Sequence, residues 1–231
     1  MKIKLGLFII LLIILLSIIS KKIYLENFNN KKELKFIHIT KTAGTTIEDE
    51  AMEKNILWGR HHKKEYGWWH RPFKNLPMKL KKKYDWFMVV RDPYERTVSE
   101  FYWWTKQHNV DIVKDKKIWN KMNRLLLEKK YNNDLLKNTM KDHGYLRDHW
   151  NPQHWYYEKN NDYKIHVLKF ENLKNDFDNL MKSYNLPIRL KKNSMKSPNK
   201  IFGVKDLDRE TIDIINRVYD KDFELFGYKK L

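Results

Sequence analysis

The chain has 231 residues, enough to bury one sizeable hydrophobic core, and its sequence gives no sign of a second domain of comparable size. It contains no cysteine, which excludes a disulfide framework, a thiolate nucleophile and a cysteine-ligated zinc. The 47 Lys and Arg residues against 29 Asp and Glu residues give a formal net charge of +18, which favours polyanions or anionic small molecules as partners. The chain is also rich in Asn and Ile, so an AT-rich genome is an alternative source of the lysine excess.

Residues 5–20 form an almost continuous run of Leu, Ile and Phe, with lysines on both sides. At about 1.5 Å per residue a helix over this run spans about 24 Å, short of a ~30 Å hydrocarbon core unless the lysines extend to the headgroups. A cleaved signal peptide is the alternative, but no Ala-x-Ala-like cleavage site is visible. We therefore predict a short tail at 1–4, a single-pass transmembrane anchor at 5–20, a polar stem at 21–33 and a folded domain at 34–231.

The orientation of this anchor in the lipid bilayer is not determined by the sequence, because both flanks are basic and the charge bias nearly cancels. A type II placement is expected from the size of the domain that follows. In a eukaryote, this placement would correspond to a Golgi-like location.

Three segments with strand-like composition are each followed by a helical pattern. Residues 35–39 (KFIHI) precede a loop and the helix-compatible stretch 47–55, and residues 84–90 (YDWFMVV) precede a helix with Asp92 as N-cap and Pro93 as first residue. Residues 164–170 (KIHVLKF) precede apolar residues at helical spacing. This repeated order predicts an α/β fold, a P-loop-like single domain with a central parallel sheet flanked by helices. Helical patches at 125–127 and 135–136 and an amphipathic helix over 207–219 complete the predicted elements.

The segment Lys41-Thr-Ala-Gly-Thr-Thr46 lies where the first predicted strand gives way to a helix. At such a turn, free backbone N–H groups point toward one place, which forms a natural cradle for a phosphate. Gly44 allows close approach of the backbone, the threonine hydroxyls add donors, and Lys41 supplies a positive charge. The segment is not a Walker A loop, because the leading glycine is missing and the lysine precedes Gly44.

A second anion-binding pattern, Arg91-Asp-Pro-Tyr-Glu-Arg-Thr-Val-Ser99, follows the second predicted strand. Arg91 ends that strand, and Ser99 lies two turns into the next helix. Carboxyl ends of parallel strands meet at one sheet edge, so both side chains are expected to reach a second phosphate there.

Together, FIHITKTAGTT and, about fifty residues later, VVRDPYERTVSEFY resemble the sulfotransferase family that uses 3′-phosphoadenosine 5′-phosphosulfate (PAPS), especially its Golgi-type, heparan sulfate-like carbohydrate branch. The segments HVLKFENLKNDFDNL and YDKDFELFGY extend the likeness over most of residues 35–229. Ala43 departs from the Gly or Ser that is more usual there. The resemblance implies that the 5′-phosphosulfate binds Lys41, Thr42, Ala43, Gly44, Thr45 and Thr46, and that the 3′-phosphate binds Arg91 and Ser99.

Sulfuryl transfer requires a base for the acceptor hydroxyl and a cation at the leaving phosphate, with no metal. Carbohydrate sulfotransferases often draw the base from the interval between the two motifs. We therefore predict His70 as the base, beside a sugar-stacking wall of Trp68 and Trp69, and Lys41 as the cation. His61 and His62 are the alternatives for the base.

Other histidines are assigned lesser roles. His38 is placed in the first strand with a structural role, while His149 and His154 are candidates for the border of the acceptor cleft.

The predicted function is transfer of a sulfuryl group from PAPS to a hydroxyl, with a carbohydrate as acceptor and no nucleic-acid partner. Two alternatives stay open. A P-loop kinase or NTPase would have the same order of strand, phosphate-binding loop and helix, but it requires the GxxxxGK[ST] pattern, which is missing here. A non-catalytic basic protein that binds polyanions or membranes would explain the charge, but not two phosphate motifs on successive strand–helix units.

Overall fold

The computed structural model describes residues 12–20, 32–62, 70–108, 113–130, 148–191 and 200–231. The chain divides into two units, Met1–Glu33 and Leu34–Leu231. In the first unit, residues 12–20 are helical, whereas residues 5–11 of the predicted anchor and 21–31 of the predicted stem lie outside the described residues. Within the described ranges, no helix has both the length and the apolar character needed to cross a bilayer. The anchor therefore stays a prediction.

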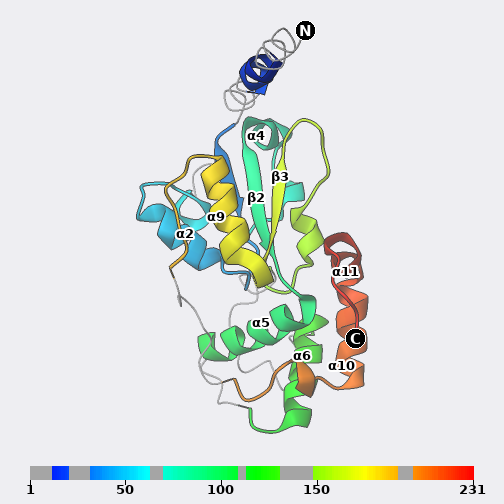
Figure 1. The fold of residues 1–231 in the computed structure, drawn as a ribbon. Helices are drawn as coiled ribbons and strands as arrows, with labels where there is room; N and C mark the ends of the chain where they lie inside the picture. Colours follow the sequence, from blue (N-terminus) through cyan, green and yellow to red (C-terminus); the bar gives the residue numbers. More distant parts are fainter. Residues whose placement is uncertain (1–11, 21–31, 63–69, 109–112, 131–147, 192–199) are drawn as a thin grey trace. The chain divides into compact units, whose positions relative to one another are not determined.

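The second unit is an α/β domain built on a three-stranded sheet of order β1-β2-β3 (Figure 1). The strands are β1 (Leu34–Ile37), β2 (Asp85–Val90) and β3 (Ile165–Lys169), and both neighbouring pairs are parallel. The predicted parallel sheet is thus confirmed, with boundaries shifted by one or two residues. One placement is wrong: β1 ends before His38, so this histidine belongs to the loop that follows the strand.

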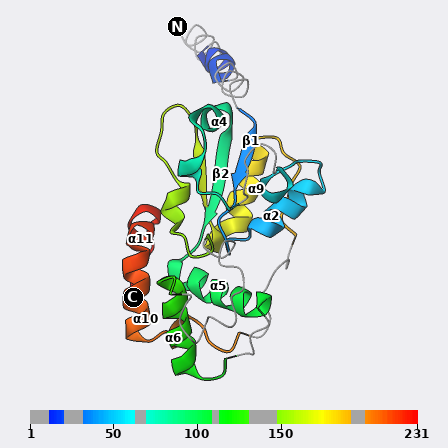
Figure 2. The same cartoon turned by 180° about the vertical axis from the view of Figure 1, so that it is seen from behind.

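Both faces of the sheet are covered, as expected for a parallel sheet whose strands are apolar throughout. Phe87 and Val89 pack on one side with α2 (Gly44–Met52) and α9 (Leu173–Ser183). The alternate residues Trp86, Met88 and Val90 pack on the other side with residues of the connecting segments. Figures 1 and 2 show α2 and α9 together on one face of the sheet. Each side chain of β2 is therefore buried, whichever way it points.

A separate helical layer lies beyond the carboxyl end of β2 (Figure 1). It consists of α5 (Pro93–Gln107), α6 (Lys116–Leu127), α10 (Arg209–Val218) and α11 (Asp220–Phe226). Its core includes Phe101, Trp119, Ile215 and Phe223. The short helix α4 (Met78–Lys83) precedes β2 at the opposite edge. The helical layer therefore borders the sheet edge where both predicted phosphate motifs begin.

The local rules that predicted α5 are confirmed. The Asp92 carboxylate accepts hydrogen bonds from the backbone N–H groups of Tyr94 and Glu95, and Pro93 is the first helical residue. The predicted helical patch at 125–127 lies at the end of α6, and the predicted C-terminal helix corresponds to α10. The patch predicted at 135–136 lies outside the described residues.

Asp115 caps α6 in the same way, accepting from the backbone N–H groups of Lys117 and Ile118. Replacing it by Ala should lower the free energy of unfolding by about 1 kcal/mol, because two helix-terminal donors lose their acceptor. Asp115→Asn retains a capping oxygen and should restore most of that loss. Urea unfolding followed by circular dichroism measures both variants, and equal stabilities of Asp115→Ala and the wild type would contradict the assignment.

Candidate functional site

The first motif forms a tight loop between β1 and α2. Lys41 and Ala43 adopt left-handed backbone conformations, with φ of 60° and 69°. The α2 helix begins at Gly44, so the first N–H groups of that helix have no partner within it and face the loop. The Thr42 hydroxyl donates to the Ile39 carbonyl at 2.8 Å, which leaves the backbone N–H of Thr42 as its group for a ligand.

Gly44 is required by a close approach to His38. A Cβ atom at this position would lie 2.3 Å from the His38 Nε2 atom, well inside van der Waals contact. The His38 ring is fixed from its other side, since its Nδ1 atom lies 2.7 Å from the buried carboxylate of Glu48 on α2. The glycine of the phosphate loop therefore serves packing as well as any approach of a ligand.

The second motif meets the first directly. Arg91 follows β2, and one of its guanidinium nitrogens, Nη1, donates to the backbone carbonyl of Lys41 at 3.4 Å. The guanidinium also lies 4.3 Å from the centre of the Phe170 ring and donates to Glu95 at 3.3 Å. Ser99 is buried on α5. Sequence reasoning placed the two motifs at one sheet edge, and the contact between Arg91 and Lys41 confirms that they meet there.

The backbone of Arg91 is held by the side chain of Gln153. The Arg91 N–H donates to the Gln153 Oε1 atom at 2.9 Å, and the Gln153 Nε2 atom donates to the Arg91 carbonyl at 2.8 Å. The buried Asp222 carboxylate in turn accepts from the Gln153 backbone N–H at 2.7 Å. These two residues were missed by sequence reasoning, because their roles depend on contacts between distant segments.

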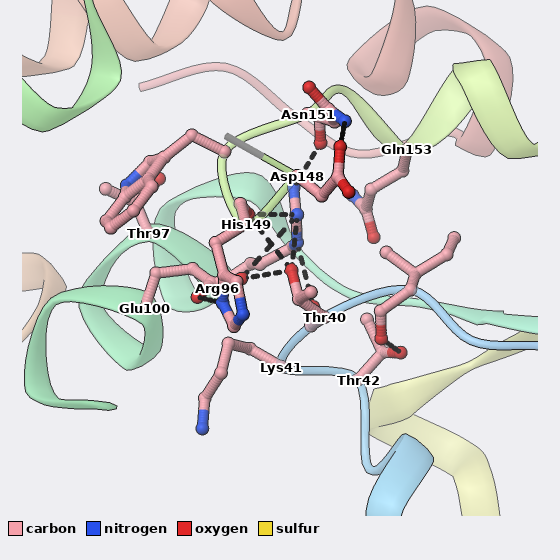
Figure 3. Close-up of polar contacts among 12 residues, drawn as sticks. Thr40, Lys41, Thr42, Arg96, Thr97, Glu100, Asp148, His149, Asn151 and Gln153 are labelled. Carbon is pink, nitrogen blue, oxygen red and sulfur yellow. Dashed lines mark hydrogen bonds and ion pairs between the residues drawn. The ribbon is translucent and has the colours of Figure 1, made fainter. Parts of the chain in front are cut away.

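A buried polar cluster ties the loop to α5 (Figure 3). The Arg96 guanidinium donates to the Thr40 carbonyl at 3.1 Å and to the His149 carbonyl at 2.8 Å. Glu100, fully buried, accepts a hydrogen bond from the Thr40 hydroxyl and lies 2.8 Å from the Nδ1 atom of His149. Arg96 and Glu100 were also missed, although both lie within or beside the second motif and Glu100 directly follows Ser99.

The predicted base, His70, lies at the centre of three histidine rings. Its ring centre is 4.9 Å from that of His38 and 5.1 Å from that of His149, with near-perpendicular planes. Burial, followed by the charges of His38, His149 and Arg96, lowers the pKa of His70 far below its usual range. The imidazole is therefore neutral at physiological pH.

The alternative histidines have other surroundings. His61 is partly exposed beside Arg60 and Asp49. His154 is bound by the Asp222 carboxylate through its Nδ1 atom at 2.7 Å. Trp68 and Trp69, predicted as a sugar-stacking wall, lie outside the described residues. In the described part of the chain, only His38 and His149 are in ring contact with His70.

Positive charge gathers around Lys41. Burial lowers the pKa of Lys41; the nearby Glu100 opposes this effect, while Arg91, Lys200 and Lys106 add to it. The side chain extends away from the polar cluster (Figure 3). Lys200 is a further cation at this site, which sequence reasoning missed. An anion bound here would relieve the mutual repulsion of these cations.

The comparison with protein families agrees with this geometry. The profile described as the sulfotransferase family matches residues 27–229. The chain belongs to the sulfotransferase family. No curated protein and no solved structure matches it. Among the described residues of this sulfotransferase, no cluster of His, Asp and Glu side chains is arranged to hold a metal ion.

The close contact between Gly44 and His38 can be tested by substitution, with the neighbouring Ala43 as a control. Gly44→Ala should lower the free energy of unfolding by about 1–3 kcal/mol, because the new methyl group would overlap the His38 ring. The adjacent Ala43→Gly change should be neutral or slightly stabilising, because Ala43 already has positive φ. Chemical denaturation of both variants measures the difference, and a Gly44→Ala protein as stable as the wild type would refute the close contact.

Proposed function

We propose that this sulfotransferase moves the sulfuryl group of PAPS to a hydroxyl, with a carbohydrate as acceptor. The single observation that carries the proposal is the junction of Arg91 with the Lys41 loop, since it unites two anion-binding motifs. Because PAPS carries a 5′-phosphosulfate and a 3′-phosphate, it needs two anion-binding sites. Loop N–H groups and Lys41 would bind the phosphosulfate end, and Arg91 with Ser99 would bind the 3′-phosphate.

In the proposed reaction, His70 takes the proton from the acceptor hydroxyl as its oxygen attacks sulfur in line. A new S–O bond forms while the bond between sulfur and the bridging phosphate oxygen breaks. Lys41 stabilises the negative charge that develops on that oxygen. The products are a sulfate ester, adenosine 3′,5′-bisphosphate and a protonated His70.

The acceptor class and location belong to the same proposal. A glycan acceptor follows from the resemblance to carbohydrate sulfotransferases and from the high content of nine tryptophans, some of which can stack on sugar rings. The apolar N-terminal run supports a single-pass anchor at 5–20. The size of the domain that follows it supports a type II orientation, with a Golgi-like location in a eukaryote.

Nucleotide selectivity is the first test of the proposed function. Adenosine 3′,5′-bisphosphate, added to the full-length protein in detergent at about a hundred times its dissociation constant, should add roughly 2.7 kcal/mol of stability and raise the melting temperature. ATP with magnesium should have a smaller effect, and a single-stranded oligonucleotide none. A response to ATP with magnesium alone would favour a kinase or NTPase, and a response to the oligonucleotide alone would favour a polyanion-binding protein.

Transfer of radiolabelled sulfate from PAPS to a panel of glycans, including heparan and chondroitin types, tests the reaction itself. Lys41→Ala should reduce kcat by at least about 100-fold, because the developing charge loses its cation. His70→Ala should reduce kcat by a similar factor. The matched controls are Lys79→Ala, in α4 at the opposite sheet edge, and His61→Ala. Wild-type activity of Lys41→Ala would refute the mechanism, and loss in His61→Ala but not His70→Ala would move the base to the alternative position.

A further inference from the structure

The row of three histidine rings is flanked at both ends by a buried carboxylate. His38 is bound by Glu48 at 2.7 Å and His149 by Glu100 at 2.8 Å, in each case through the Nδ1 atom. All five side chains are at most 5% exposed. A carboxylate only accepts hydrogen bonds, so both Nδ1 atoms must carry the proton. The rings on either side of His70 are thus fixed in orientation and in tautomer.

Both ends of this row of rings contact the loop between β1 and α2. At one end, His38 packs against Gly44, so closely that no side chain fits there. At the other end, Glu100 accepts the hydroxyl proton of Thr40, the residue before Lys41. Contacts on both sides of His70 therefore fix its position relative to the proposed phosphosulfate loop.

Each carboxylate also has a cationic neighbour. The Arg60 Nε atom lies 3.6 Å from Glu48, and its backbone N–H donates to the same carboxylate at 3.1 Å. Glu100 lies 3.7 Å from Arg96. Burial alone would raise the pKa of Glu100, but His149, Arg96 and Lys41 outweigh it and the pKa is lowered. Glu100 is thus an anion within the protein interior.

Several charged and titratable groups surround His70. The rings of His38 and His149 contact it, and Arg96 acts on it as a nearby cation. Tyr156 donates to the His70 backbone carbonyl at 2.9 Å. When His70 gains a proton, a buried positive charge forms beside Arg96, and such a charge is costly without nearby anions. Glu48 and Glu100 are the anions bound to the two rings that contact His70.

We propose that Glu48 and Glu100 are positioning residues, which hold His38 and His149 through their Nδ1 atoms and stabilise the imidazolium formed on His70 during transfer. This inference rests on the proposed role of His70 as base. The proton leaves the acceptor hydroxyl, binds the His70 imidazole and is released to solvent after the turnover. Neither carboxylate is protonated in the process.

Glu100→Gln removes the negative charge at nearly constant size. Its amide oxygen can still accept from His149, and the Thr40 hydroxyl, which loses its carboxylate acceptor, can still donate to the His149 carbonyl. We expect kcat to fall at least about tenfold, because the imidazolium that forms on His70 loses a nearby anion. Glu100→Asp should recover part of this loss, and Glu210→Gln, an exposed acid on α10, should leave kcat unchanged.

Binding of adenosine 3′,5′-bisphosphate separates this role from a structural one. Glu100→Gln should keep the wild-type dissociation constant within about twofold while kcat falls. A kcat equal to that of the wild type would overturn the inference. A lower kcat together with a raised dissociation constant would also overturn it, because the carboxylate would then act only through the structure.

Nitrogen-15 NMR of the imidazoles tests the inference without turnover. At neutral pH, His38 and His149 in the wild type should each carry a proton on Nδ1. A ring at either position without a proton on Nδ1 would overturn the inference. If the wild type binds the bisphosphate but sulfates no glycan, the proposed acceptor fails, whereas the Nδ1 protons still decide on the two carboxylates.

Discussion

The arrangement of the site depends on one buried cation, the guanidinium of Arg96. It is 1% exposed and donates to backbone carbonyls of Thr40, Asn151 and His149, which come from two segments far apart in the sequence. A buried guanidinium is tolerated only when its N–H groups are satisfied and an anion is near, and Glu100 supplies that anion one turn along α5. The requirement to satisfy Arg96 therefore fixes the loop after β1, the helix α5 and the segment at 148–151 relative to one another (Figure 3).

The same constraint explains which features were predictable from the sequence. The strands are short, apolar and β-branched, and the Asp92-Pro93 cap obeys a local rule, so both follow from a few neighbouring residues. The meeting of the two motifs follows from parallel topology alone. Arg96, in contrast, looks like an ordinary polar residue on a helix in the sequence pattern. Only the fold shows that its side chain points inward, because its partners lie about 50 residues away on either side.

The histidines illustrate this limit further. His38 was placed in the first strand, but β1 stops at Ile37 while β2 continues to Val90, so the chain turns there and His38 meets Gly44. His149 has no periodic or motif signal, and its contact with His70 joins segments almost eighty residues apart. The sequence places His70 between the two motifs and offers His149 only as a candidate for the border of the acceptor cleft, but it gives no sign that the two rings meet.

The C-terminal helix contributes to the site through a chain of hydrogen bonds. Asp222, buried on α11, binds the backbone N–H of Gln153, and the Gln153 amide then pairs with both backbone groups of Arg91. This pairing satisfies the backbone just where β2 leaves the sheet, so no neighbouring strand is needed there. The orientation of the arginine proposed to bind the 3′-phosphate is thus determined partly by a helix about 130 residues further along the chain. Residues near the C-terminus therefore belong to the architecture of the proposed nucleotide site.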